Sequence, residues 1–196
     1  EYGIMENFNF ADIIDKIKQE VKLQAGDDYH VPNIIEFCES KHFLNLSVKL
    51  YPVQRIILKT FYRGQPGNEN VELDTKELEL LYDLNLQSVL DKYNSDEIFR
   101  ELVLVLGRRA SKDFLTSLIA LYEAMRLLEL PGGDPFKFYG LDPGDPIYIL
   151  TVANSADQAK ILFNGIKNKI TASEYFKDKI GHMTSDTIWL KTDSDK

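Results

Sequence analysis

The sequence predicts an α/β protein in which helices flank a parallel sheet, with a helical lead-in before the sheet and a helical insertion within the fold. Two observations carry this prediction. Continuous apolar runs of strand length occur at residues 102–106 and 147–153, as is typical of strands buried on both faces. A turn and a long helical pattern follow each run, and strands that alternate with helices indicate a parallel sheet with right-handed crossovers.

Length and composition favour one folded domain. A chain of 196 residues can bury one sizeable core, and 44% hydrophobic with 28% charged residues excludes a disordered protein. The formal net charge of −8 provides no overall positive field for nucleic acid, so any contact with DNA must be local.

Cysteine usage and hydropathy indicate a soluble protein of a reducing cytoplasm. The single cysteine, Cys38, excludes an intramolecular disulfide and a cysteine-rich zinc site, and we expect it to be a buried apolar residue. No apolar run approaches the roughly 20 residues that span a bilayer, and the N-terminus lacks the pattern of a signal peptide.

Residues 1–45 are predicted to form the helical lead-in. Apolar residues at three- and four-residue steps predict an amphipathic helix from Phe10 to about Gln24, which ends at Gly26. A short second helix is expected at 33–39, after a proline.

Residues 46–196 are predicted to form the main domain. Its parts are a helix at 50–62, the helical insertion at 66–97, a strand, turn and helix at 99–130, and a strand and helix at 146–170. Pro52 stands at a favoured early position of the first helix, and Asn154 or Ser155 is the expected N-cap of the last one.

The turn at 107–113 carries the chemistry that the sequence offers. A phosphate-binding loop needs a buried strand, a turn whose N–H groups point inward, a lysine for the outer phosphates and the positive end of a helix. Lys112 stands where such a lysine belongs, at the carboxyl edge of the expected sheet, where ligands bind. The sequence departs from the strict pattern G-x-x-x-x-G-K-[ST] at Leu106, Ser111 and Asp113. An ordinary strand-to-helix turn with solvated arginine and lysine side chains is therefore the alternative interpretation.

Three segments in order resemble one family. Residues 99–112 resemble the deviant Walker A region of terminase large subunits, the ATPase motors that package DNA in tailed bacteriophages. Upstream, 51–54 resembles the adenine-binding motif of that family, and downstream 147–159 is similar to its next strand and helix, with an Ala-x-x-x-x-Gln-Ala signature that includes Gln158. The resemblance covers roughly residues 46–170.

The resemblance implies an incomplete P-loop NTPase domain of the RecA-like (ASCE) class that binds ATP with Mg²⁺. Lys112 would bind the β- and γ-phosphates, Arg108 would offset the charge that develops in phosphoryl transfer, and Gln54 would read the adenine edge. Lys112 and Arg108 are therefore the candidate catalytic residues. The implied nucleotide contacts are Tyr51, Gln54, Arg55, Gly107, Arg108, Arg109, Ala110, Ser111, Lys112 and Asp113.

Two departures from the motif bear on activity. Ser111 replaces a glycine that allows close approach or a positive φ, and Asp113 replaces the hydroxyl that ligates Mg²⁺. Asp113 is thus a candidate Mg²⁺ ligand that also places negative charge near phosphate. We expect altered nucleotide binding.

Catalytic parts of the family are missing after residue 170. No apolar run ends in Asp-Glu, and the only later strand candidate, 187–190, is followed by Lys191 and Thr192. The nuclease domain of a full terminase is absent, and the acidic residues of the tail and the three histidines lack metal-ligand spacing. Weak or absent hydrolysis by this chain is therefore expected. The acidic tail residues are Asp186, Asp193 and Asp195, and the histidines are His30, His42 and His182.

The resemblance also implies partners. These are double-stranded DNA, the portal protein, the small terminase subunit and further copies of the chain in a ring, in the cytoplasm of an infected cell and away from membranes. Two other functions stay open from the residues alone. One is a RecA-like helicase fragment, and the other is a non-catalytic assembly module whose phosphate loop has decayed.

Overall fold

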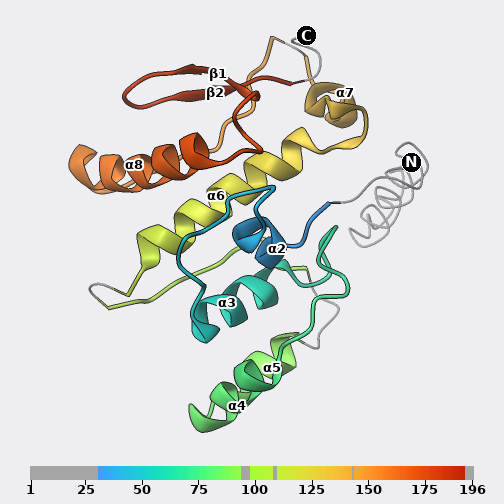
Figure 1. Ribbon diagram of the computed structural model, residues 1–196, viewed down its shortest axis with the longest axis vertical. Helices are drawn as coiled ribbons and strands as arrows, with labels where there is room; N and C mark the ends of the chain where they lie inside the picture. The colour runs from blue at the N-terminus through green and yellow to red at the C-terminus, as the bar shows by residue number, and fades with distance from the viewer. Residues whose placement is uncertain (1–30, 94–97, 108–109, 143, 193–196) are drawn as a thin grey trace, which may run out of the picture.

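A computed structural model describes residues 31–93, 98–107, 110–142 and 144–192 of the chain, and helices are its main regular secondary structure (Figure 1). The helix expected at 10–24 lies outside these residues. None of the described helices has the length and apolarity needed to cross a bilayer. In chain order the elements are α2 (Ile34–Glu39), α3 (Pro52–Tyr62), α4 (Thr75–Asp83), α5 (Gln87–Tyr93), α6 (Lys112–Leu128), η1 (Pro131–Gly133), α7 (Pro135–Tyr139), α8 (Ala156–Ala172), β1 (Ile180–Met183) and β2 (Ile188–Leu190).

Local capping signals fix where the helices begin. Asn33 Oδ1 accepts hydrogen bonds from the first turn of α2, and Ser155 Oγ accepts one from Gln158 N at the start of α8. Pro52 opens α3, and α6 begins at Lys112. The predictions of a helix at 33–39, at 50–62 and at 156–170 are thus confirmed. Helices α4 and α5 lie within residues 66–97, the predicted helical insertion, and that this segment is an insertion in a larger fold stays a prediction.

The main core surrounds α6. This helix packs against α8 on one side and against α2 and α3 on the other, and its apolar stripe is fully buried between them. Cys38 of α2 lies in this core, which confirms the expectation of a buried thiol. The largest fully buried side chains of the core are Tyr62, Tyr122, Phe37, Phe176, Ile34, Leu58, Leu115, Leu118, Leu121, Met125 and Ile170.

A buried polar network ties the loop after α3 to this core. Asn68 accepts a hydrogen bond from Ile34 N at 3.0 Å and donates one to Tyr122 Oη at 2.7 Å, while Tyr122 donates to Pro32 O. Gly67 has φ 83°, and a Cβ there would lie 2.5 Å from a backbone oxygen of the segment before α2. Only glycine permits this approach, so the loop fixes α2 against α6.

The insertion rests on α3 through a second, smaller core. Ile56 of α3 packs with Leu73, Leu81 and Tyr93, which come from α4, α5 and the loop that precedes them. The insertion is therefore anchored on the face of α3 that looks away from α6, at the lower end of the view in Figure 1.

The only sheet among the described residues is a two-stranded antiparallel hairpin. Ile180 pairs with Leu190 and Met183 with Ile188, and Thr184 N donates to Thr187 O across the turn. Strand β2 falls within the segment 187–190 that the sequence marked as a strand candidate. This sheet is not the parallel one that the sequence predicts.

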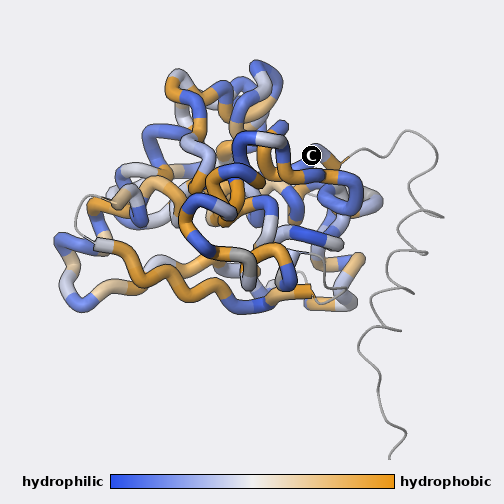
Figure 2. The backbone as a smooth tube through the Cα atoms, turned by 90° about the horizontal axis from the view of Figure 1, so that it is seen from below, coloured by the Kyte–Doolittle hydropathy of each residue, from blue (hydrophilic) through white to orange (hydrophobic). Residues whose placement is uncertain are grey.

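The two apolar runs expected to form the parallel sheet are extended but unpaired. Within the described part of the chain, 147–153 makes no backbone–backbone hydrogen bond, and 101–107 makes only a turn bond at Gly107 O. Val103 and Val105 are 81% and 92% exposed, and the run forms a hydrophobic border of the molecule in Figure 2. A strand needs a neighbouring strand to complete its ladder, and none of the described strands lies against these runs. The parallel sheet therefore stays a prediction.

Candidate functional site

The loop before α6 has a backbone conformation that favours glycine. Ala110 N donates to Gly107 O at 3.3 Å, which closes a turn, and Ser111 then adopts φ 60° and ψ 23° in the left-handed region. Helix α6 begins at the next residue, Lys112. Ser111 occupies the place of the second glycine of the phosphate-loop pattern, and its φ is the one that such a glycine adopts without strain. Arg108 and Arg109 lie outside the described residues.

Three backbone N–H groups in the first turn of α6 have no hydrogen-bond acceptor among the described residues. Ser111 is the N-cap, but its side chain makes no capping hydrogen bond, and the first backbone bond of the helix runs from Leu115 N to Ser111 O. No described residue accepts a bond from the N–H groups of Lys112, Asp113 or Phe114. Because free N–H groups and the helix dipole both attract anions, this end of α6 has the physical features of a phosphate-binding position.

Lys112 and Asp113 bring opposite charges to this end of α6. Both side chains are exposed, so both can reach a ligand from solvent. The lysine reinforces the positive end of the helix, whereas the carboxylate opposes an anion unless a cation lies between them. Asp113 is the one described carboxylate in this first turn, so it is the residue here that could hold Mg²⁺ beside a phosphate. Among the described residues no cluster of three or more His, Cys, Asp or Glu side chains could hold a metal ion.

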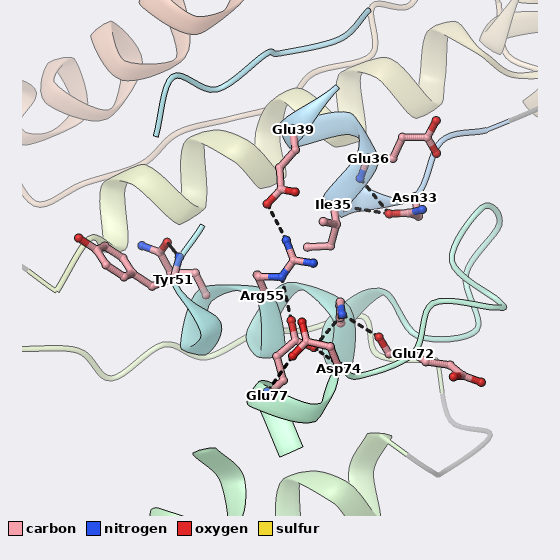
Figure 3. Close-up of polar contacts among 11 residues, drawn as sticks. Asn33, Ile35, Glu36, Glu39, Tyr51, Arg55, Glu72, Asp74 and Glu77 are labelled. Atoms are coloured by element: carbon pink, nitrogen blue, oxygen red, sulfur yellow. Dashed lines mark hydrogen bonds and ion pairs between the residues drawn. The ribbon is translucent and has the colours of Figure 1, made fainter. Parts of the chain in front are cut away.

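At the start of α3 the residues of the predicted adenine motif have different environments. Tyr51 is the N-cap and is 67% exposed, whereas Gln54 is only 8% exposed. Gln54 Oε1 accepts a hydrogen bond from Tyr51 N at 2.9 Å (Figure 3). The amide of Gln54 thus caps α3, and this hydrogen bond sets the orientation of the amide.

Arg55 is held by carboxylates on two other helices. Its Nη1 donates to Glu39 Oε1 of α2 at 2.6 Å and its Nε donates to Glu77 Oε1 of α4 at 2.8 Å (Figure 3). Burial lowers the pKa of the guanidinium, but the hydrogen bonds to Glu77 and Glu39 outweigh this effect and raise the pKa above its ordinary value. Arg55 of α3 thus links this helix to α2 and α4 through two ion pairs.

Helices α3 and α6, which begin at the two groups of predicted residues, contact each other through Tyr62 and Tyr122. The rings of Tyr62 and Tyr122 meet edge to face with centroids 4.8 Å apart, and Tyr62 Oη donates to Glu123 at 2.8 Å. Tyr62 follows Tyr51, the N-cap of α3, by the same number of residues as Tyr122 follows Ser111, the N-cap of α6. Both helices run from left to right in Figure 1, so both begin at the left, where α8 also begins.

A protein family matches nearly the whole chain. Residues 10–191 match the family described as "Uncharacterized protein MJ0330, N-terminal P-loop domain". The chain belongs to this family. No curated protein and no solved structure matches the chain. Membership supports nucleotide binding, and the loop between Gly107 and Lys112 is the segment of this P-loop domain that has the order of strand-like run, turn, lysine and helix.

The acidic partners of helix α3 were missed in the sequence analysis. Glu39 and Glu77 hold Arg55, and Glu77 also accepts a hydrogen bond from Lys59. A local signal for Glu77 exists, since Asp74-Thr75-Lys76-Glu77 is a capping box in which Asp74 and Glu77 cap each other's backbone. Its contact with Arg55 joins residues 22 positions apart and depends on how α3 and α4 pack.

Proposed function

We propose that this chain binds the phosphates of ATP, together with Mg²⁺, at the loop that precedes α6. The observation that carries the proposal is the left-handed Ser111, which leads into a helix that begins at Lys112 and whose first-turn N–H groups have no acceptor in the part of the chain that the structure describes. Membership of a P-loop family supports the same assignment.

In this proposal each residue of the loop has its own contact with the nucleotide or with Mg²⁺. The backbone N–H groups of Lys112 and Asp113 face the outer phosphates, and the ammonium group of Lys112 neutralises their charge. Arg108 follows the extended run and supplies a second cation for the γ-phosphate. Asp113 would hold Mg²⁺, which supplies charge neutralisation between phosphate oxygens when it is bound.

The proposed activity is binding with slow hydrolysis. Fast hydrolysis needs a carboxylate that orients the attacking water, and the described strands β1 and β2 are not followed by an Asp-Glu pair. In the hairpin turn, Thr184 Oγ1 donates a hydrogen bond to Asp186 Oδ1, so this carboxylate stabilises the turn. Bound ATP should therefore stay largely unhydrolysed on this chain.

Calorimetry with ATP, with and without Mg²⁺, tests the proposal when it is repeated on Lys112→Ala. We expect the variant to lose at least tenfold in affinity. Lys76→Ala is the matched control, because Lys76 is also an exposed lysine in the first turn of a helix, α4. We expect the Lys76→Ala variant to bind ATP with the affinity of the wild type. Equal affinity in Lys112→Ala and the wild type, or no binding by either, would sink the proposal and favour a non-catalytic assembly module.

A narrower proposal is that the chain is the ATP-binding part of a terminase motor that packages double-stranded DNA in a ring at the portal. It rests on the resemblance of three ordered segments, which contain Gln54, Lys112 and Gln158. The competing helicase function predicts strand separation. Measurement of ATP turnover and of duplex unwinding with blunt double-stranded DNA separates the two, because a packaging motor is stimulated by intact duplex without unwinding it.

A further inference from the structure

The insertion and the end of α3 form a pocket that the proposed nucleotide site does not include. Its volume is about 580 Å³, in the range of pockets that bind small molecules. Leu73 and Tyr93, which line the pocket, are buried in the second core, and Leu78 and Leu90 line it where they are partly buried against that core. The pocket therefore has apolar walls on a packed base.

Arg63, the C-cap of α3, brings a fixed cation to this pocket. Its guanidinium lies over the ring of Tyr93, 4.7 Å from the ring centroid, and its Nε donates to Tyr93 O. Within the described part of the chain, no carboxylate forms an ion pair with Arg63 and its other N–H groups have no acceptor. A guanidinium that is stacked on a ring and keeps unused N–H groups can bind a carboxylate through two parallel hydrogen bonds.

Glu69 and Glu72 bring negative charge to the same pocket from a loop whose backbone is fixed. Val71 O accepts from Tyr93 Oη, and Glu72 O accepts from Lys59 Nζ at 2.7 Å. Figure 3 shows the side chain of Glu72 directed away from α3. Both carboxylates are exposed, and neither has an ion pair or a hydrogen bond with a residue that the structure describes. The pocket thus holds charges of both signs that do not neutralise each other.

The two signs of charge limit the class of ligand. An anion that contacts Arg63 also meets the repulsion of the two carboxylates, and a cation that contacts the carboxylates also meets the guanidinium. A ligand that carries both charges satisfies both sides of the pocket. The walls at Leu78 and Leu90 suit an aliphatic group between or beside these charges.

We propose that this pocket binds a small zwitterion with an aliphatic side chain, an amino acid or a short peptide. The carboxylate of the ligand contacts Arg63, and its ammonium group contacts Glu69 or Glu72. Arg63 belongs to α3 and the two glutamates to the loop that leads into α4, so the bound zwitterion links the insertion to α3.

Calorimetry of the full chain with L-leucine and with leucyl-leucine tests the inference, because the two ligands hold their charges at different separations. The matched ligands are N-acetyl-L-leucine, which lacks the ammonium group, and L-leucinamide, which lacks the carboxylate. We expect leucine or leucyl-leucine to bind at least tenfold more tightly than either matched ligand, the loss of hydrogen bonds to a charged group. No binding of leucine and leucyl-leucine, or equal affinity for a ligand that lacks one charge, would overturn the inference.

Variants of the pocket assign each charge of the ligand to its partner. Arg63→Gln keeps an N–H donor for Tyr93 O and removes the cation, so it should lower the affinity for the zwitterion at least tenfold and leave that for L-leucinamide unchanged. Glu69→Gln combined with Glu72→Gln should lower the affinity for the zwitterion in the same way and leave that for N-acetyl-L-leucine unchanged.

Glu79→Gln is the matched control, since Glu79 is an exposed glutamate of α4 that does not line the pocket. It should bind the zwitterion as the wild type does, and thermal unfolding should give the same midpoint for all these variants. A loss of affinity in Glu79→Gln as large as in the pocket variants would contradict the inference. So would a loss in Arg63→Gln that is equal for the zwitterion and for L-leucinamide.

Discussion

Lys59 donates a hydrogen bond to Glu77 across 2.7 Å between α3 and α4, and both side chains are almost completely buried. Lys59 also donates to Glu72 O, and Glu77 also accepts from Arg55 and from Asp74 N, so the charges are compensated within one network (Figure 3). The network ties the insertion to the helix that carries the predicted base contacts.

Removal of one member of this pair should cost far more than removal of both. Glu77→Ala leaves Lys59 buried and uncompensated, and we expect a loss of about 3–5 kcal/mol in the free energy of unfolding. The double variant Lys59→Met with Glu77→Leu replaces the pair by apolar groups of similar size and should recover most of that loss. Urea unfolding followed by circular dichroism measures both. Equal destabilisation in the single and double variants would show that the charges are not coupled.

Asp74 should make stability depend on pH in the acidic range. The backbone hydrogen bond from Glu77 N lowers the pKa of this N-cap carboxyl below its ordinary value. A lowered folded pKa means that the stabilisation is present above about pH 4, the unfolded pKa, and is lost as the pH falls through the folded pKa.

Two variants of Asp74 separate charge from capping. Asp74→Asn keeps a capping side chain and should flatten the stability profile below about pH 4 with little effect at pH 7, whereas Asp74→Ala should cost about 1 kcal/mol at pH 7. Thermal unfolding between pH 2 and pH 7 gives the comparison. An unchanged acid slope in Asp74→Asn would assign the pH dependence to other carboxyl groups.

Local signals in the sequence were sufficient for the helices but not for the sheet. Pro52, Lys112 and Ser155 mark helix starts that the structure has at the predicted positions, because capping and helical periodicity act within a few residues. The runs at 102–106 and 147–153 are also extended, as predicted, but their pairing depends on neighbouring strands that no local pattern specifies. Strand β1 was missed because Gly181 and His182 interrupt its short apolar pattern.

The candidate site was predictable only in part for the same reason. The position of Lys112 at the start of α6 follows from the local order of run, turn and helix. The roles of Gln54 and Arg55 do not follow from local order. The sequence allows both side chains as ligand contacts, but in the structure Gln54 caps α3 and Arg55 forms ion pairs with Glu39 and Glu77. Tertiary contacts decide between these uses.

Ser111→Gly should stabilise the loop and tighten phosphate binding. A residue with a Cβ at φ 60° is strained by about 1 kcal/mol, and glycine removes that strain at some cost in unfolded-chain entropy. We expect a net gain of about 0.5 kcal/mol in stability and a severalfold gain in ATP affinity. Ser111→Ala is the control, since it removes the hydroxyl and keeps the Cβ. Gains in Ser111→Ala as large as in Ser111→Gly would rule out backbone strain as the cause.

The extended run before the loop should respond to substitution with a period of two. Val105 is 92% exposed, whereas Leu104 is partly buried and packs against the main core. Because successive side chains of an extended chain point to opposite sides, Val105→Lys should change the free energy of unfolding by less than about 0.5 kcal/mol, and Leu104→Lys should lower it by about 2 kcal/mol or more. Val105→Lys should also reduce self-association, because a charge on an exposed apolar edge opposes strand pairing between copies. Urea unfolding and light scattering of the two variants measure these effects. Equal destabilisation by both lysines would show that Val105 is buried in solution, with the run paired on both sides as in a sheet.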